Sequence, residues 1–301
     1  MNIRKLLFVS AGVIFCLAVF IYLGAGAYIA FKLTHVKREP VTVNPTSLGL
    51  PFLNLSFTST DNIHLSGWLV KANPIGNTTV IFVHGLENNR AQPHHLELAK
   101  HFGSEGISSL LFDLRAQGKS AGSFVSAGFF EQRDVVSAVR QIPSHECRII
   151  LGSSAGAAAA ILAAKQLTTE ANGLIIDSSY ANINDLLVGE ISKSIAWNPS
   201  VARIFIPGAA LMTNIMYGMD LSQLNLVNII SKIPYPVLII HGQADSRIPV
   251  SQAYQLYRAA PASSKLLIVP KADHTFAYIT DTKAYLSAVD QYIKDSCKKI
   301  H

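Results

Sequence analysis

Short apolar runs alternate with amphipathic stretches along most of the chain. The runs cover residues 79–85, 109–115, 148–152, 173–178, 237–242 and 265–270. Each run is too short for a helix and too uniformly apolar for a sheet with one wet face, so each predicts a buried parallel strand. Helical spacing recurs near residues 92–104, 129–142, 154–168, 249–260 and 282–295. This alternation predicts an α/β fold, a mostly parallel sheet flanked by helices.

Two segments depart from the alternation. Residues 55–60 and 63–72 have the pattern of two strands joined at Asp61-Asn62, which is a hairpin signal. Residues 181–232 are rich in Ile, Leu and Met and are too long for an ordinary crossover connection. We therefore expect a helical cap or lid inserted at 181–232, within one domain that extends over residues 53–297.

The N-terminus has a different pattern, because no charged residue occurs from Leu6 to Phe31. As a helix this run would reach roughly 39 Å, more than the ~30 Å hydrocarbon core of a bilayer. It predicts a transmembrane signal anchor over residues 6–31, followed by a connector over 32–52. The alternative is a cleaved signal peptide, because Ala25-Gly26-Ala27 resembles a cleavage site. However, the apolar run is longer than a signal-peptide core and continues past that site.

Charge and cysteine content narrow the partners and the location. The formal net charge is +6 over 301 residues and is not gathered into basic blocks, which disfavours a nucleic-acid partner. The short basic N-terminus predicts that the rest of the chain lies on the non-cytoplasmic side of the membrane. The three cysteines are too few for a disulfide framework, and pairing of Cys147 with Cys297 stays open. His and Cys lack metal-ligand spacing, so no metal or cofactor is expected, and nothing in the sequence indicates the oligomeric state.

The stretch G-S-S-A-G at 152–156 lies between a predicted strand and a predicted helix. A Gly-x-Ser-x-Gly turn at that junction holds its central serine in a tight, strained conformation at a helix N-terminus. Gly152 and Gly156 flank Ser154 at the required offsets, whereas Ser153 has Leu and Ala at those offsets. We therefore predict that Ser154 is the nucleophile and that the following alanines pack the helix against the sheet.

A serine hydroxyl needs a general base, and the base needs an orienting acid. Asp245 and His274 each follow a predicted strand, so both are expected at the sheet edge that carries Ser154. Ser154, Asp245 and His274 are therefore predicted to form a catalytic triad. Asp177, which ends the strand before the cap, is the alternative acid.

An oxyanion hole needs two donors aimed at the developing negative charge. The backbone N–H groups of Ala155 and Leu86 are predicted to supply them. His84 is interpreted as a residue that shapes the loop before Leu86. We expect Asp273 to shape the histidine loop and the polar residues of 113–120 to brace neighbouring loops.

These residues resemble the α/β-hydrolase superfamily, in the branch of dienelactone hydrolases and prolyl-oligopeptidase-like enzymes. The resemblance covers about 55–295 and rests on H-G-L at 84–86, D-L-R-A-Q-G-K-S at 113–120, G-S-S-A-G at 152–156, D-S-R-I-P at 245–249 and D-H at 273–274. It implies an esterase-like activity without a cofactor. Ser153 stands where many relatives have an aromatic residue or histidine, which predicts a wider pocket wall beside the nucleophile.

The sequence therefore predicts a membrane-anchored serine hydrolase that cleaves carboxylic ester or thioester bonds through an acyl-enzyme. The apolar insert and the anchor favour a lipid-like or long-acyl substrate. A serine peptidase or an acyltransferase with the same triad remains an alternative. A catalytically inactive, membrane-tethered scaffold and a soluble secreted esterase are the others.

Overall fold

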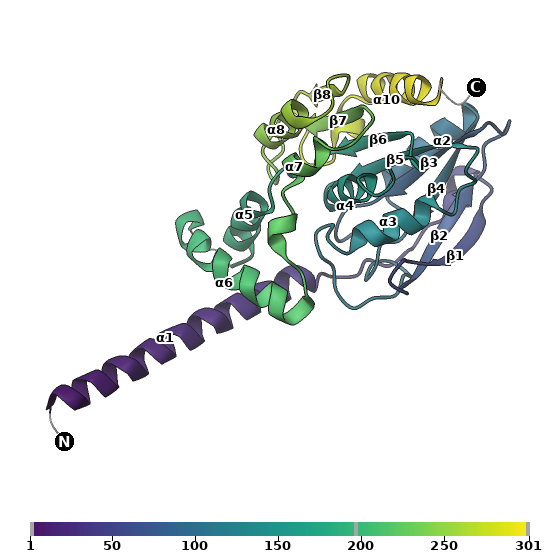
Figure 1. Ribbon diagram of the computed structural model, residues 1–301. Coiled ribbons are helices and arrows are strands. Elements are labelled where there is room, and N and C mark those ends of the chain that lie inside the picture. Colours follow the sequence, from purple (N-terminus) through teal and green to yellow (C-terminus); the bar gives the residue numbers. More distant parts are fainter. Residues whose placement is uncertain (1–2, 196–197, 299–301) are drawn as a thin grey trace. The chain divides into compact units, whose positions relative to one another are not determined.

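The computed structural model describes residues 3–195 and 198–298 of the chain (Figure 1). The chain forms two compact units. One comprises Met1–His35 and Ile183–Gln223, and the other comprises Val36–Asn182 and Leu224–His301. The second unit holds the sheet, and the first is helical.

The sheet has eight strands in the order β1-β2-β4-β3-β5-β6-β7-β8. The antiparallel pair β1 and β2 confirms the predicted hairpin, and β2 also runs antiparallel to β4. All pairs from β4 to β8 are parallel, as the apolar runs predict. The strands are β1 (Leu53–Thr58), β2 (His64–Val70), β3 (Thr78–Val83), β4 (Ile107–Phe112), β5 (Cys147–Ser153), β6 (Gly173–Asp177), β7 (Val237–Gly242) and β8 (Lys265–Val269).

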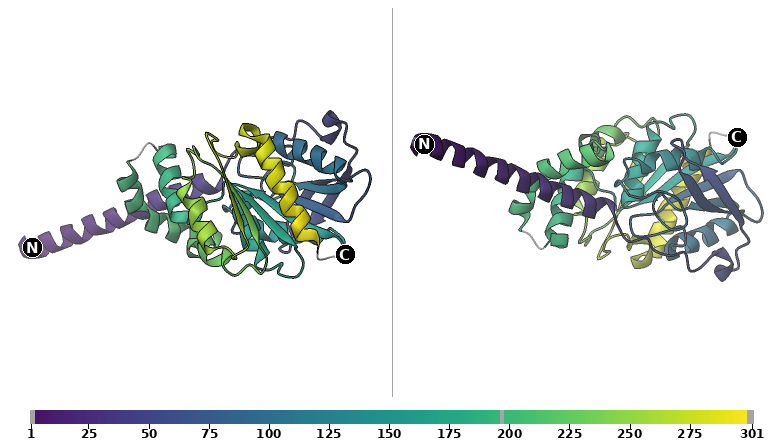
Figure 2. Two further views of the ribbon diagram at one scale, coloured as in Figure 1. Left: turned by 90° about the horizontal axis from the view of Figure 1, so that it is seen from above. Right: turned by 90° about the horizontal axis from the view of Figure 1, so that it is seen from below.

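Helices cover both faces of this sheet. Helices α2 and α10 lie against one face, where α10 crosses the strands in yellow (Figure 2), and α3 and α4 lie against the other (Figure 1). Every predicted helix of this domain is present. The helical segments of the unit are η1 (Pro45–Leu48), α2 (Pro93–Ser104), α3 (Glu131–Val139), α4 (Ala155–Ala164), α7 (Leu226–Ile230), α8 (Ser251–Ala259), α9 (Ala277–Thr280) and α10 (Thr282–Cys297).

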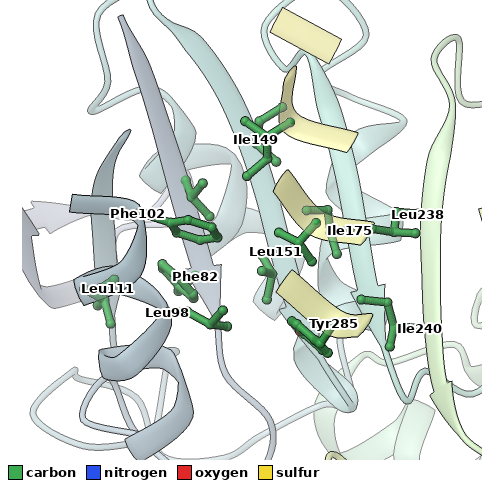
Figure 3. Packing of buried hydrophobic residues seen from close by; sticks show 14 of the residues in the cluster. Phe82, Leu98, Phe102, Leu111, Ile149, Leu151, Ile175, Leu238, Ile240 and Tyr285 are labelled. Carbon is green, nitrogen blue, oxygen red and sulfur yellow. The ribbon is translucent and has the colours of Figure 1, made fainter. Parts of the chain in front are cut away.

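The core between the sheet and the helices α2 and α10 is closely packed (Figure 3). Phe82 and Leu151 point from neighbouring strands toward Phe102 of α2 and Tyr285 of α10, and all four are almost fully buried. On α4 the alanines from 157 to 160 have no exposed surface, in agreement with the predicted packing role. Small side chains let this helix approach the strands closely, which fixes the position of its N-terminus at the sheet edge.

The helical unit contains the N-terminal helix and most of the predicted cap. Its segments are α1 (Ile3–Thr34), α5 (Ile183–Ile195), α6 (Pro199–Tyr217) and η2 (Leu221–Gln223). Helix α1 extends the predicted span by three residues at each end. The cap boundaries at 181 and 232 stay a prediction, and residues 196–197 of that segment lie outside the described residues.

Cys147 and Cys297 form a disulfide with a Cα–Cα distance of 5.6 Å, which resolves the pairing that the sequence left open. The bond ties the first residue of β5 to the last residue of α10 across a sequence separation of 150 residues. A disulfide constrains the unfolded chain most when it closes a long loop, so this one stabilises the sheet unit.

Removing this disulfide is expected to lower the thermal stability of the protein. Loss of a native disulfide costs about 2–5 kcal/mol, which for a domain of this size lowers Tm by roughly 4–20 °C. We expect Cys297→Ser and the reduced wild type to show the same fall in a thermal unfolding scan of the detergent-solubilised chain. Cys16→Ser is the matched control, because Cys16 is exposed and unpaired. A reductant-insensitive Tm for the wild type would contradict the pairing.

Candidate active site

Ser154 stands between the end of β5 and the start of α4 with φ 55° and ψ −122°. Positive φ is uncommon for a residue with a Cβ and marks a strained turn. The flanking glycines make this turn possible. A Cβ at Gly152 would lie 2.7 Å from the carbonyl oxygen of Gly156, and one at Gly156 would collide with the carbonyl oxygen of Val83. The turn therefore has the strand-to-helix geometry that the glycine spacing predicts.

The structure brings the three predicted triad side chains together. The Oγ atom of Ser154 lies 2.9 Å from Nε2 of His274, and Nδ1 of His274 lies 2.8 Å from Oδ2 of Asp245. In the tautomer with a proton on Nδ1, the Ser154 hydroxyl donates to Nε2 and the imidazole donates to Asp245. His274 can then accept the serine proton while the carboxylate holds the ring in place.

The Asp245 carboxylate is held by four hydrogen-bond donors. Its Oδ1 accepts bonds from the backbone N–H groups of Arg247 and Ile248 at 2.9 and 2.7 Å. Its Oδ2 lies 3.2 Å from Nε2 of His241 as well as beside His274. Burial would raise the pKa of this carboxyl, but the hydrogen bonds from His241 and His274 outweigh burial and hold the pKa well below its usual range. Asp245 is therefore ionised at neutral pH.

His241 is the residue of this site whose role sequence reasoning missed. Its side chain is fully buried at the end of β7, and Nε2 bonds the carbonyl oxygen of Ile248 at 2.8 Å. Burial lowers the pKa of His241, yet the hydrogen bonds to Asp245 and Ile248 raise it above its usual value overall. The spacing of four residues between His241 and Asp245 was the available signal. Only the turn after β7 folds the two side chains together.

Asp177 occupies a separate environment at the end of β6. Its carboxylate accepts a hydrogen bond from the hydroxyl of Ser178 at 2.9 Å and is 1% exposed. Burial raises the pKa of Asp177. The Ser178 hydroxyl accepts a bond from the backbone N–H of Thr275, so Asp177 is linked to the histidine loop through the side chain of Ser178.

The loop that follows β3 lies directly beside Ser154. A Cβ added at Gly85 would be 3.2 Å from Cβ of Ser154, so a larger residue here would press on the nucleophile. His84 accepts a hydrogen bond from the N–H of Leu114 at Nε2 (3.1 Å) and donates from Nδ1 to the carbonyl oxygen of Gly85 (2.8 Å). Burial lowers the pKa of His84, which keeps the ring neutral. His84 thus shapes the loop, as expected.

The backbone N–H groups of Leu86 and Ala155 stay the expected oxyanion donors, and both lie in segments next to Ser154. Leu86 follows Gly85 in this loop, and Ala155 is the first residue of α4. The N–H of a first helical residue has no acceptor within its own helix and carries the positive end of the helix dipole. Both groups come from segments in contact with Ser154.

The Ser153 side chain is turned into the protein interior, and the wider pocket wall stays an expectation. Its side chain is 1% exposed, and its Oγ lies 3.1 Å from Nε2 of His95 on α2. Successive residues of a strand point to opposite faces, so the two neighbouring serines diverge. Burial holds the pKa of His95 well below its usual value, so this pair is a neutral hydrogen bond in the protein interior.

The remaining polar residues brace loops around the site, as expected. Asp113 accepts bonds from the N–H groups of Arg90 and Lys119, each at 2.7 Å. Arg115 pairs with Asp134 at 2.6 Å and with Asp61 of the hairpin turn at 2.8 Å. These ion pairs tie the segment 113–120 to β1, β2 and α3.

The histidine loop has its own brace in Asp273. This carboxylate accepts bonds from the N–H groups of Ser246 and His274 at 2.8 and 2.7 Å. It links the loop after β7 to the loop after β8, which carry the predicted acid and base. Within residues 3–195 and 198–298, no group of three or more His, Cys, Asp and Glu side chains is placed to hold a metal ion.

Comparison with known proteins connects this geometry to a family. The family model described as serine aminopeptidase, S33 matches residues 76–207. The protein YfhR of Salmonella typhimurium is 29% identical over 236 residues, covering 75% of each chain. The lysophosphatidylserine lipase ABHD12 of Danio rerio is 25% identical over 210 residues, which are 66% of this chain and 51% of that one.

Solved structures show the same fold. An esterase from Pyrococcus furiosus superposes with a TM-score of 0.72 at 22% sequence identity, covering 87% of this chain and 98% of that one. An α/β hydrolase from Penicillium, GrgF, superposes with a TM-score of 0.63 at 17% identity over 82% and 99% of the two chains. The mostly parallel sheet and its flanking helices are thus the shared feature.

Proposed function

Because the chain belongs to the α/β-hydrolase superfamily, we propose that it is a serine hydrolase that cleaves carboxylic ester or thioester bonds. The observation that supports this proposal most is the hydrogen-bonded series Ser154, His274 and Asp245. Each of the three side chains leaves a different loop at the carboxyl edge of the sheet, where ligands of open α/β sheets bind.

In the proposed reaction, Ser154 Oγ attacks the acyl carbonyl carbon and its proton passes to Nε2 of His274. The N–H groups of Leu86 and Ala155 bind the oxyanion of the tetrahedral intermediate. His274 then protonates the leaving oxygen or sulfur, which departs and leaves an acyl-enzyme. Water, deprotonated by His274, attacks this ester and releases the acid with Ser154 restored. Asp245 stabilises the imidazolium in both halves of the reaction.

We propose that α1 anchors the protein in a membrane and that the sheet unit lies on its non-cytoplasmic side. Among the described residues, α1 is the one helix long and apolar enough to cross a bilayer, a test that a signal sequence also passes. The Cys147–Cys297 disulfide favours an oxidising compartment for the domain. A membrane location and the lipase activity named for the zebrafish relative both favour lipid-like acyl esters as substrates.

A serine peptidase with the same residues is the second candidate, because the matching family model is described as a serine aminopeptidase. Acyl transfer would use the same acyl-enzyme with another acceptor in place of water. Ester hydrolysis, peptide hydrolysis and acyl transfer differ in the acyl group and in the acceptor, and the triad is the same for all three.

The test uses the full wild-type chain in detergent. We expect a fluorophosphonate to label one serine per chain, with the adduct on Ser154 by peptide mass spectrometry, and to block turnover of nitrophenyl esters in proportion. Monoacylglycerol, a lysophospholipid and an aminoacyl nitroanilide, assayed in parallel, separate a lipase from a peptidase. A folded sample that neither reacts with the fluorophosphonate nor hydrolyses any of these substrates would instead be an inactive scaffold.

A further inference from the structure

A tyrosine of α1 joins the hydrogen-bond ladder of α6. Pro207 has no N–H and so interrupts the backbone hydrogen bonds of α6. The hydroxyl of Tyr22 is inserted into the next backbone hydrogen bond of the helix. This hydroxyl donates to the carbonyl oxygen of Ile204 at 2.9 Å and accepts from the N–H of Gly208 at 3.0 Å. Ile204 and Gly208 are the two ends of one i, i+4 helical bond. The hydroxyl therefore bridges the donor and the acceptor of the helical bond that follows the proline.

The backbones of the two helices also touch. A Cβ at Gly26 would lie 2.6 Å from the carbonyl carbon and oxygen of Gly208, and one at Gly208 would lie 2.8 Å from the Tyr22 ring. The Tyr22 ring stacks on Phe205 with a centroid distance of 5.6 Å. Close approach at glycines together with an interhelical hydrogen bond is how helices associate in or beside a membrane. Helix α6 is thus fixed to α1 at Tyr22.

The surface of α1 changes at the same residue. Residues 7–21 are all exposed, whereas Gly26, Ile29 and Ala30 are buried. The uncharged residues 6–21 extend about 24 Å as a helix, within the ~30 Å thickness of a hydrocarbon core. One side of α1 is therefore buried beyond Tyr22, while Tyr28 and Phe31 on the rest of its surface stay exposed. Tyrosine is a residue type enriched where helices leave a membrane.

Helix α6 has an apolar stripe that no other described residue buries. Val201, Ile204, Leu211 and Ile215 are 40%, 62%, 50% and 66% exposed, and Pro207 between them is exposed too. Intervals of three, three, four and four residues put these five side chains on one side of the helix. Arg203 is the one charged residue among the 19 of α6. Water alone would be a poor environment for such a surface.

We propose that this stripe of α6 lies in the surface of the bilayer that α1 enters, at the boundary between headgroups and acyl chains. The stripe begins beside the exposed part of α1, because the Ile204 carbonyl accepts a hydrogen bond from Tyr22, the residue that follows Ile21. Among the described helices, α6 is not apolar enough to cross a bilayer. This composition fits a helix that lies in the membrane interface. The proposal rests on the anchoring role proposed for α1 and is independent of the hydrolase chemistry.

Spin labels on the full chain test this location. On a Cys16→Ser background, single cysteines replace Leu211, Ile215, Phe15 or Ser222 and carry a nitroxide, since Cys147 and Cys297 are paired. The variants are reconstituted into vesicles of phosphatidylcholine and phosphatidylglycerol, with far-UV circular dichroism as the check of folding. Power saturation then compares collision with oxygen, which concentrates in lipid, and with a water-soluble nickel chelate.

We expect labels at Leu211 and Ile215 to collide more with oxygen than with nickel, as the label at Phe15 in the span does. The label at Ser222, an exposed polar position of the same unit, should show the reverse. Nickel access at Leu211 and Ile215 would overturn the proposal. So would spin–spin broadening that disappears on dilution with unlabelled chain, because a second copy would then cover the stripe. Nickel access at Phe15 would overturn the anchor, and the proposal with it, while fluorophosphonate labelling reports on the hydrolase separately.

Discussion

Replacing Ser154 with alanine is expected to abolish ester hydrolysis and fluorophosphonate labelling, whereas Ser153→Ala is expected to keep most of both. Loss of a serine nucleophile from a triad lowers kcat by up to about 10⁶-fold. In Ser154→Ala, His274 keeps its bond to Asp245 but has no hydroxyl to deprotonate. Only the oxyanion donors and substrate binding would remain, and these leave a slow residual rate.

The neighbouring serine is a matched control because it shares the backbone and the chemistry but faces the interior. Ser153→Ala removes the hydrogen-bond partner of His95. A buried group left without its partner costs about 1–3 kcal/mol of stability. We therefore expect a lower Tm for this variant with a nearly normal kcat. Stoichiometric labelling of Ser154→Ala, or an inactive but folded Ser153→Ala, would refute the choice between the serines.

The sequence was sufficient for the architecture because the signals of the fold are local. A continuous apolar run such as 237–242 predicts a buried strand without any knowledge of its neighbours, and β7 has these bounds. The signal for the Gly-x-Ser-x-Gly turn is also local, because a side chain at Gly152 or Gly156 would collide with residues of the turn and one adjacent strand. Parallel strands bring their carboxyl ends to one edge, so the chain order of Ser154, Asp245 and His274 was enough to place them together.

The remaining features depend on contacts between distant segments. Cys147 and Cys297 are 150 residues apart, and no spacing rule places the end of α10 beside the start of β5. The direction of the Ser153 side chain depends on α2, which supplies His95. Hydropathy also treats lipid and protein surroundings alike. Residues 22–31 belong to one apolar run with the residues before them, yet Gly26, Ile29 and Ala30 are buried while Tyr28 and Phe31 stay exposed.

Replacing Asp245 with asparagine is expected to lower kcat by about 10⁴-fold with little change in folding. Asparagine keeps an oxygen for the N–H groups of Arg247 and Ile248 but loses the charge that orients and stabilises protonated His274. Since hydrogen bonds hold the pKa of Asp245 well below its usual range, the wild-type carboxylate is charged at neutral pH. The variant should therefore show its full deficit in an assay at neutral pH.

Substitutions of Asp177 and Asp273, two carboxylates near the site, test whether Asp245 is the acid of the triad. Asp177→Asn removes the alternative acid, whose carboxylate bonds Ser178, and should lower kcat by less than about tenfold because the His274–Asp245 bond stays intact. Asp273→Asn keeps one oxygen for the N–H groups of Ser246 and His274 and should behave similarly. Initial rates with a nitrophenyl ester, together with Tm, separate loss of chemistry from loss of fold. A severe loss in folded Asp177→Asn with a mild one in Asp245→Asn would reverse the assignment, because the charge that matters would then lie at the end of β6.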